Sequence, residues 1–593
     1  MSSTFGGLNT AVRGLYAQQA SLDTVGHNIS NANTTGYSRQ SVNLITTSPE
    51  NLYGMYGVNQ KGSGVDVASV TRARDAFIDK QFWKESSTLG AGQMTVDYLG
   101  RIEGVFQEPS DTGIQTTLNN FWTAWQTLGT NAADDGMRTA VRQRGVELVD
   151  AIQHATQQLN DMITDSNTVI GIKVNKVNEL SSQIYDLNRQ IVRIETGGTD
   201  HANDLRDRRD VLVDQMSQLV GITVNEDKSG AYSIQAGGVP LVSGAGFETL
   251  EARSMNDPDY GYEVKNVYVK GGANPLVFKG GEIQGLLDIR DNSTAAGDPK
   301  DGIKGYLEKL NTMSKFLLQD FNAVHKQGLG KDNSTGYNFF GESATDYAAF
   351  TTTPPNGLKW ISELKVNPSL FNTADGLSKI AAKTAINNLT VQQTNAAGSA
   401  ATVTSAYTAA TPLNYRVKIT TDSSGAVTGV TSSLDGGTTW TAATGTPPSF
   451  ILAGSSGTVS IKIPTDSHNA TGDEYSFSVT QGNAAGDNAV NLANRLKADK
   501  SAILGNASLD TYYSAYIGGL GVESQSAQKL TQNQVTLIGQ ITNWREQVSG
   551  VSVDEEMTNM IRFQKGYAAA ARIITTMDEM FDTLINKTGV VGR

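Results

Sequence analysis

The two ends of this 593-residue chain each carry the heptad pattern of an amphipathic helix. Apolar residues that alternate at three and four positions form a stripe along one helix face, as in a coiled coil. A lone helix of this kind is marginal in water unless another surface covers its stripe. We therefore predict that the ends pair as a coiled coil and form an assembly interface. The residues assigned to this interface are Leu8, Val12, Leu15, Leu22, Val25, Ile29, Met560, Phe563, Tyr567, Ile574, Met577, Phe581 and Leu584.

Capping signals set the expected bounds of both helices. Ser552 stands three residues before Glu555, which is the spacing of a capping box. The C-terminal helix is therefore predicted to run from about residue 553 to about residue 587. The N-terminal helix is expected to end near Asn31, where a stretch rich in Asn and Thr begins.

Composition excludes several classes of protein. A net charge of −12 argues against a general binder of nucleic acid or anionic membranes, because both would need a basic face. The chain has no cysteine, so disulfides and thiolate metal sites are excluded. No stretch approaches the ~18 apolar residues of a membrane span, and the first residues lack the pattern of a cleavable leader. We expect a protein that stays in the cytoplasm or leaves it by a route that reads another signal.

The chain is predicted to be nested, with three or four domains at roughly 150 residues each. Helical periodicity dominates from about 71 to 220 and from 303 to 325, and alternation with a period of two marks the β segments. The predicted fold class is α+β and multidomain, with paired terminal helices, an elongated helical bundle, a small β unit and an inserted β-rich domain. The predicted domains are an axial core domain of 1–60 plus 550–593, a helical domain of 61–344 plus 488–549 with a β unit at about 222–300, and an inserted outer domain of 345–487.

Candidate catalytic and metal-binding patterns are weak. The five histidines never lie within a helix turn of one another, so we interpret each as a solvated or capping residue. Residues 328–331 fail as a phosphate loop, and residues 225–230 are better explained by a hairpin turn than by a calcium loop. Asp200, Asp204, Asp207 and Asp210 share a helix face beside arginines, which predicts a solvated charged face with ion pairs. No catalytic, cofactor-binding or metal site is predicted.

Two separated motifs carry a family resemblance. The stretch from Leu22 to Gln40 resembles the N-terminal signature of bacterial flagellar rod, hook and hook-associated proteins, and the stretch from Ser549 to Leu584 is similar to their C-terminal helix. Residues 202–210, 285–291, 322–325 and 339–340 match as well. The sequence Tyr-Ser-Arg-Gln at 37–40 resembles the hook-associated branch, whereas rod and hook relatives more often have Gly-Phe-Lys there. The signature residues are Asn28, Asn31, Asn33, Gly36, Tyr37, Arg39, Gln40, Asp554, Glu555 and Glu556.

The resemblance implies a structural role outside the cell, at the junction between hook and filament. The implied partners are the hook protein, the second junction protein, neighbouring copies, the flagellar type III export apparatus, and an export chaperone that binds the C-terminal helix. A hook or distal rod subunit, and a flagellum-associated hydrolase, are the alternatives. An adhesive or antigenic role of the inserted domain on the outer surface is compatible with the junction role. The Asn-rich cluster is either a plain helix cap or a contact that positions the chain in a lattice.

Overall fold

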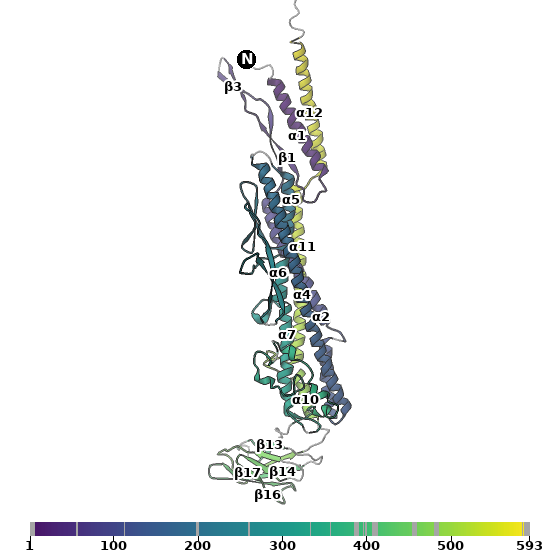
Figure 1. Ribbon diagram of the computed structural model, residues 1–593, viewed down its shortest axis with the longest axis vertical. Helices are drawn as coiled ribbons and strands as arrows, with labels where there is room; N and C mark the ends of the chain where they lie inside the picture. Colours follow the sequence, from purple (N-terminus) through teal and green to yellow (C-terminus); the bar gives the residue numbers. More distant parts are fainter. Residues whose placement is uncertain are drawn as a thin grey trace, which may run out of the picture.

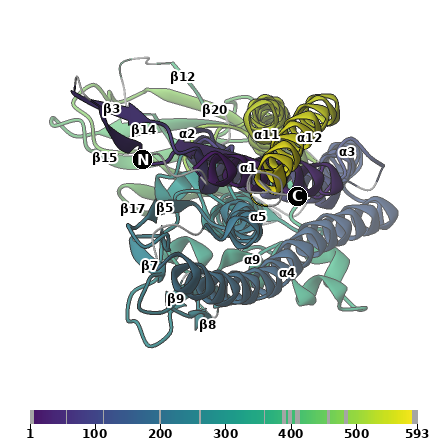
Figure 2. The ribbon, with the colours of Figure 1, turned by 90° about the horizontal axis from the view of Figure 1, so that it is seen from above.

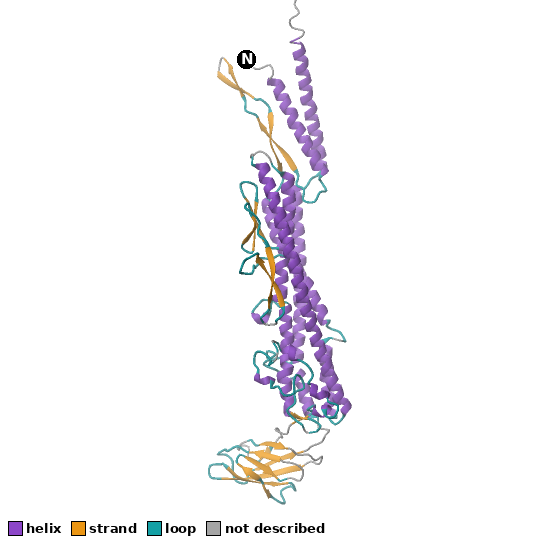
Figure 3. Ribbon diagram, in the orientation of Figure 1, coloured by secondary structure: helices purple, strands orange, loops and turns teal. Residues whose placement is uncertain are grey.

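The computed structural model is a long rod with the terminal helices at one end and a separate β domain at the other (Figure 1). Helices form the shaft, and short strands lie along one side of it (Figure 3). The structure describes residues 6–583 and Ile585, apart from 55–56, 112, 197–200, 259–260, 333, 356, 358, 385–390, 395–396, 398–399, 406–412, 454–458 and 480–485. The α+β multidomain class is confirmed.

The two ends of the chain pair as antiparallel helices. Helix α1 (Gly6–Ser30) lies along α12 (Val553–Asp582). Gly7 of α1 lies against Met577 of α12, and Gly566 of α12 lies against Gln18 of α1, so that an added Cβ atom at either glycine would clash. At the other end of the pair, Asn28 of α1 donates to Glu556 of α12. Glycines at these contacts let the two backbones approach closely. The residues that α1 buries are accordingly small or polar at most positions: Ala11, Ala17, Ser21, Val25 and Asn28.

The predicted heptad stripe is only partly covered by this pairing. Val25 is buried, whereas the other predicted positions on α1 stay half-exposed beside the seam. On α12, Tyr567 is exposed and Leu584 lies outside the described residues. The half-buried positions are Leu8, Val12, Leu15, Leu22, Ile29, Met560, Phe563, Ile574, Met577 and Phe581. Much of the apolar stripe therefore remains available to other molecules.

The terminal unit extends beyond the predicted limit at residue 60. Strand β1 (Gln40–Thr46) pairs with β4 (Val65–Arg72), and both pack against α1. Between them, β2 (Glu50–Gly54) and β3 (Gly57–Lys61) form a projecting hairpin. The predicted domain limit at residue 60 was wrong, because it places β4 in a different domain from β1, the strand with which β4 forms backbone hydrogen bonds.

The shaft is a helical bundle with one continuous apolar core. Helix α4 runs along most of the shaft, and α2 packs between α11 and the pair of α5 and α6. The bounds are α2 (Ala76–Phe106), α3 (Ile114–Thr130), α4 (Asp135–Glu195), α5 (Asn203–Leu219), α6 (Glu282–Asp291), α7 (Ile303–Phe316), α8 (Asn322–Gln327), α9 (Trp360–Glu363), α10 (Asp487–Lys497) and α11 (Leu509–Ser549). A π-helical turn, η2 (Leu317–Phe321), joins α7 to α8, and short 3₁₀ turns occur at η1 (Thr294–Ala296), η3 (Tyr347–Ala349), η4 (Pro368–Phe371) and η5 (Gly376–Lys379).

The β unit of the shaft is smaller than predicted. Three antiparallel strands, β5 (Ile222–Glu226), β6 (Tyr232–Ala236) and β7 (Val239–Val242), form one sheet, and β8 (Leu250–Asn256) pairs with β9 (Glu263–Val269). The β5–β6 connection is a hairpin turn in which Asp227 accepts backbone hydrogen bonds, as expected. The predicted limit near 300 was wrong, because 282–291 is helix α6, whose apolar side packs on α2.

The inserted β domain starts later than the predicted residue 345. Trp360, Leu364 and Leu370 belong to the shaft core, and β11 (Lys383–Thr384) pairs with β10 (Gly328–Leu329) in the shaft. Residues 345–384 were wrongly assigned to the insert, because they contain few charged residues, as the insert does. His325 also corrects a prediction: it is buried, not solvated, and accepts a bond from the Ala381 backbone N–H at 3.0 Å. Burial lowers the pKa of His325 to about 4.

Two antiparallel sheets enclose a separate core in the insert. One sheet has the order β12-β20-β14-β15-β16 and the other β13-β19-β18-β17. The core residues alternate along the strands, as in a β-sandwich. The bounds are β12 (Gln392–Gln393), β13 (Thr402–Ser405), β14 (Leu413–Thr421), β15 (Val427–Ser433), β16 (Thr441–Ala442), β17 (Thr444–Thr446), β18 (Ser449–Leu452), β19 (Val459–Lys462) and β20 (Glu474–Val479).

Deleting the insert is expected to leave the shaft folded. Its two connections meet, because the Ala489 N–H donates to the Ala382 carbonyl at 3.0 Å. Replacing 385–486 by a short Gly-Ser linker should shift the melting temperature of the shaft by only a few degrees. Deleting 345–487 should instead unfold it, because each large core residue removed costs about 2–5 kcal/mol. Circular dichroism melts of both variants beside the parent protein test this, and equal stability of the two would contradict it.

Candidate functional site, a polar joint below the terminal helices

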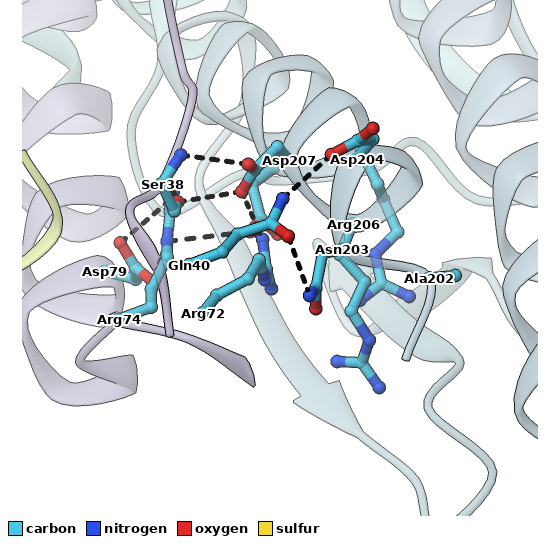
Figure 4. A network of polar contacts seen from close by, with 12 residues as sticks. Ser38, Gln40, Arg72, Arg74, Asp79, Ala202, Asn203, Asp204, Arg206 and Asp207 are labelled. Carbon is cyan, nitrogen blue, oxygen red and sulfur yellow. Dashed lines mark hydrogen bonds and ion pairs between the residues drawn. The ribbon is translucent and has the colours of Figure 1, made fainter. Parts of the chain in front are cut away.

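A buried network of charged and polar side chains connects the terminal helix pair to the shaft (Figure 4). Four parts of the chain contribute to it: residues 28–40, residues 72–79, helix α5, and the segment where α11 is followed by α12. We call this network the joint. Its members are Asn28, Ser38, Arg39, Gln40, Arg72, Arg74, Asp79, Asp207, Asp210, Asp214, Arg545 and Glu556.

Two aspartates of α5 bind the segment that leaves α1 and the arginines at the end of β4. Asp207 accepts from the Ser38 backbone N–H at 2.9 Å and from the Ser38 hydroxyl at 2.7 Å. The Arg72 guanidinium donates to Asp207 at 2.6 Å and to Asp210 at 2.8 Å. Burial would raise the pKa of the Asp210 carboxyl, but the charges of Arg74 and Arg72 outweigh it and hold that pKa below its ordinary value. The Asp210 carboxylate is therefore held as an ion inside the protein.

A second set of ion pairs ties α2 and α5 to α11. Arg74 donates to Asp79 at 2.8 Å, and Asp79 also accepts from Arg545 at 2.7 Å. Arg545 donates to Asp214 at 2.7 Å, and the Trp83 indole N–H donates to the same carboxyl at 2.6 Å. Burial raises the pKa of Asp214 more than Arg545 lowers it. Helix α11, which comes last in the shaft, is thereby joined to the first shaft helix.

Asn28 connects the end of α1 to the start of α12. Its amide exchanges two 2.9 Å hydrogen bonds with the backbone of Gln40, and it accepts the Tyr37 hydroxyl at 2.7 Å. Its Nδ2 donates to Glu556 at 3.2 Å. Arg39 donates to Glu556 at 2.8 Å, and its backbone N–H donates to the Ser549 carbonyl at 2.8 Å. The first turn of α12 is therefore fixed by the residues that follow α1.

The structure brings most of the predicted signature residues into this joint or beside it. Asn31 donates to the His27 carbonyl and so closes α1, and Gln40 donates to Asp204 at 2.9 Å. Ser552 caps α12 through the Glu555 N–H, whereas the Glu555 carboxylate faces Arg39 at 3.2 Å. Burial, followed by Asp204, Asp207 and Glu556, raises the pKa of Tyr37, so its hydroxyl stays protonated. Three signature residues, Asn33, Asp554 and Glu555, are exposed.

The prediction of a solvated charged face on α5 was wrong. Asp204 is exposed, but Asp207 and Asp210 are buried, and Arg209 is fully buried with its guanidinium over the Tyr232 ring. Their regular spacing did place the carboxylates on one helix face. The arginines that cover this face, Arg72 and Arg74, come from more than a hundred residues earlier in the chain, so no local pattern indicated burial. Arg545, Asp79 and Asp214 were missed for the same reason.

Gly36 allows the turn after α1 to lie against α5. Its φ is +78°, and an added Cβ atom would lie 2.1 Å from a methyl carbon of Val211. Gly36→Ala should therefore destabilise the protein by about 1–3 kcal/mol, from left-handed backbone strain and the clash. Gly26→Ala is the matched control, because that helical glycine has nothing within 4 Å of an added Cβ atom. It should stabilise by roughly 0.5–1 kcal/mol. Urea unfolding measures both, and equal effects would contradict the prediction.

Clefts lie on both sides of the turn at 31–37. One, of about 610 Å³, is bounded by the turn, α4 and α5. The other, of about 970 Å³, is bounded by the turn, α5 and the end of α11. Among the described residues, no group of three acidic, histidine or cysteine side chains is placed to hold a metal ion. Within the same described part of the chain, no helix is both long and apolar enough to cross a membrane.

These features define an elongated multidomain structural protein whose two ends pair and are fixed to a helical shaft. Family models match in the same three places. The helical domain of the flagellar hook-associated protein FlgK matches residues 99–340, the C-terminal model of the flagellar basal body rod FlgEFG proteins matches 546–587, and the flagella basal body rod protein model matches 8–37.

Relatives match along the whole chain. Flagellar hook-associated protein 1 of Bacillus subtilis is 29% identical over 100% of both chains, and that of Escherichia coli is 28% identical over 98% of this chain and 99% of its own. The solved flagellar hook junction protein FlgK from Burkholderia pseudomallei shares the fold, with a TM-score of 0.54 and 19% identity over 79% of this chain and 100% of its own. The chain is thus similar along its whole length to flagellar hook-associated protein 1 of other bacteria, and its helical part matches the FlgK helical domain.

Proposed function

We propose that the protein is the structural subunit that forms the junction between the hook and the filament of the bacterial flagellum. The observation that carries this function is the antiparallel pair of α1 and α12, which leaves part of its apolar stripe uncovered. Burying one large apolar side chain contributes roughly 1.5–3 kcal/mol. A row of half-covered apolar residues therefore supplies a strong driving force for packing against other axial subunits.

The joint gives this assembly a defined geometry. If the terminal pair lies in the wall of a tube, then the buried ion pairs of α5 and α11 determine where the shaft projects from it. Such a network needs its partners in place, because breaking a buried ion pair costs about 3–5 kcal/mol. The insert lies at the far end of the shaft from the terminal helices, so it would face away from the axis (Figure 1).

The partners follow from this position. The terminal helices would contact the hook protein below, neighbouring copies at the side and the second junction protein above. Before assembly, an export chaperone would cover the C-terminal helix, and the flagellar type III export apparatus would carry the unfolded chain to an extracellular position on the flagellum. The exposed apolar residues of α12 that suit a chaperone contact are Met557, Ile561, Ile573 and Met580. The role is structural, and we propose no catalysis for it.

Electron microscopy of a deletion strain, together with an assay for flagellin in the medium, tests the function. Hooks without filaments, with flagellin lost to the medium, are the expected result, and restoration of filaments by the plasmid-borne gene is the control. Absent hooks would indicate a hook or distal rod subunit instead. Normal filaments would contradict the proposal.

A further inference from the structure

Trp544, near the end of α11, differs from the other tryptophans of the chain. Trp83 and Trp360 donate their indole N–H groups to partners within the protein, and Trp125 is fully buried. Trp122 and Trp440 lie under lysine ammonium groups. Trp544 is 48% exposed, and among the described residues no hydrogen bond or ring contact involves its side chain. A large aromatic side chain left in water in this way is typical of an anchor residue in a protein–protein interface.

The helix around Trp544 has the composition of an interface. Leu530, Leu537 and Trp544 recur every seven residues along α11, and Leu530 is exposed as well. Helix α11 has five charged residues in 41, whereas α4 has fifteen in 61. Depletion of charge together with exposed aromatic and aliphatic residues distinguishes the centre of an interface from ordinary surface.

A cleft that fits such an anchor lies at the same level of the shaft. It is the 610 Å³ cleft between the turn at 31–37, α4 and α5, and its apolar wall includes Leu187, Val211 and Leu212. Arg545, the neighbour of Trp544, is bonded to Asp214, which lies one helix turn from Val211. Asp186 also lines the cleft, and a carboxylate is an acceptor for the indole N–H that a buried tryptophan needs to bond.

Helix α11 of the same chain does not border this cleft. None of the described residues of α11 or α12 lines it, and the turn at 31–37 lies between it and the cleft that α11 does line. Seen from above, α11 and α4 lie on different sides of the shaft (Figure 2). A contact between two different surfaces of identical subunits repeats head to tail, and it therefore builds a ring or a helical tube instead of a closed dimer.

We infer that Trp544 of one copy inserts into the cleft between α4, α5 and the 31–37 turn of the neighbouring copy. The inference rests on the proposed function, because a tubular junction is what sets copies side by side with their shafts at similar levels. The turn at 31–37 then has a second role besides ending α1, because it forms one wall of the cleft that receives Trp544 of the neighbouring copy.

Cysteine cross-linking in assembled flagella tests this contact cleanly, because the chain has no cysteine of its own. A strain would produce the protein with both Trp544→Cys and Leu212→Cys, and isolated flagella would be treated with a short bis-maleimide. We expect a ladder of dimers and larger products that contain only this protein. Either single variant should stay monomeric, and so should the purified double variant in dilute solution.

The control pair is Val522→Cys with Leu212→Cys. Val522 is exposed on the same helix, but at about 1.5 Å per residue it lies roughly 33 Å from Trp544 along the axis. This pair should give no ladder. Monomer alone from the Trp544 pair in normally assembled flagella would overturn the inference, and so would linkage of residue 544 to a different protein. Immunogold labelling of the parent protein separates the two ideas: labelling away from the hook–filament boundary contradicts the proposed function, whereas labelling there without a ladder contradicts only the contact.

Discussion

Asp210→Asn should destabilise the protein by about 3–5 kcal/mol, because it leaves buried arginines without a compensating charge. Asp210 is 1% exposed and accepts from Arg72 at 2.8 Å, with Arg74 at 3.5 Å. The amide that replaces the carboxylate keeps the shape but removes the charge. Urea unfolding of the purified protein at neutral pH, followed by circular dichroism, gives the free energy of unfolding directly.

The pH dependence follows from the same carboxyl. Its pKa in the folded protein is below its ordinary value, so the unfolded chain binds the proton more readily. The stabilisation is therefore fully present above the ordinary pKa of an aspartate, about 3.9. It is lost as the pH falls from there toward the lower pKa of the folded state. The Asp210→Asn variant lacks this titrating group, so its free energy of unfolding should fall less than that of the parent protein as the pH is lowered.

Asp204→Asn is the matched control, since it makes the same change on the same helix. Asp204 accepts from Gln40 and lies 3.3 Å from His27, but its side chain is 58% exposed. Water screens such contacts, and exposed pairs contribute only about 0–1 kcal/mol. If the two variants lost the same stability, the burial of Asp210 would have no energetic consequence and the account of the joint would be wrong.

Val25→Asp should abolish filament attachment while leaving the shaft folded. Val25 is buried in the pair of α1 and α12, and an unpaired charge placed there carries a desolvation cost of several kcal/mol. None of the described residues of α1 or α12 belongs to the continuous core of the shaft. We therefore expect loss of motility and flagellin in the medium, as in the deletion strain, with a shaft melting temperature within a few degrees of the parent protein.

Gln19→Asp controls for the added charge on the same helix. Gln19 is exposed, so its replacement leaves the seam unchanged, and swimming should persist. Swimming zones in soft agar and immunoblots of secreted flagellin measure both variants. Filaments of normal length on cells that carry Val25→Asp would show that the pairing of the two ends is not needed for the junction.

Features encoded locally could be predicted from the sequence. The amphipathic period at each end and the cap at Ser552 predicted α1 and α12. Helix α12 begins at the predicted residue 553, and α1 ends at Ser30, one residue before the predicted end, whereas the predicted end of α12 near residue 587 lies outside the described residues. The alternation at 459–463 and at 475–479 predicted two strands of the insert, β19 and β20. The boundary of that insert could not be predicted, because Trp360 and Leu370 join the shaft core through contacts with helices far away in the sequence.

The sequence alone determined that the two ends pair, which family the chain resembles and which residues mark it, because these properties depend on residue types at fixed local spacings. Only the tertiary structure decided which charges are buried. Asp207, Asp210 and Glu556 have the spacing of ordinary solvated helix residues, and they become buried partners of arginines because Arg72, Arg74 and Arg39 reach them from other elements. Burial is a property of the whole chain packing at once, and the cleft beside the signature turn exists for the same reason.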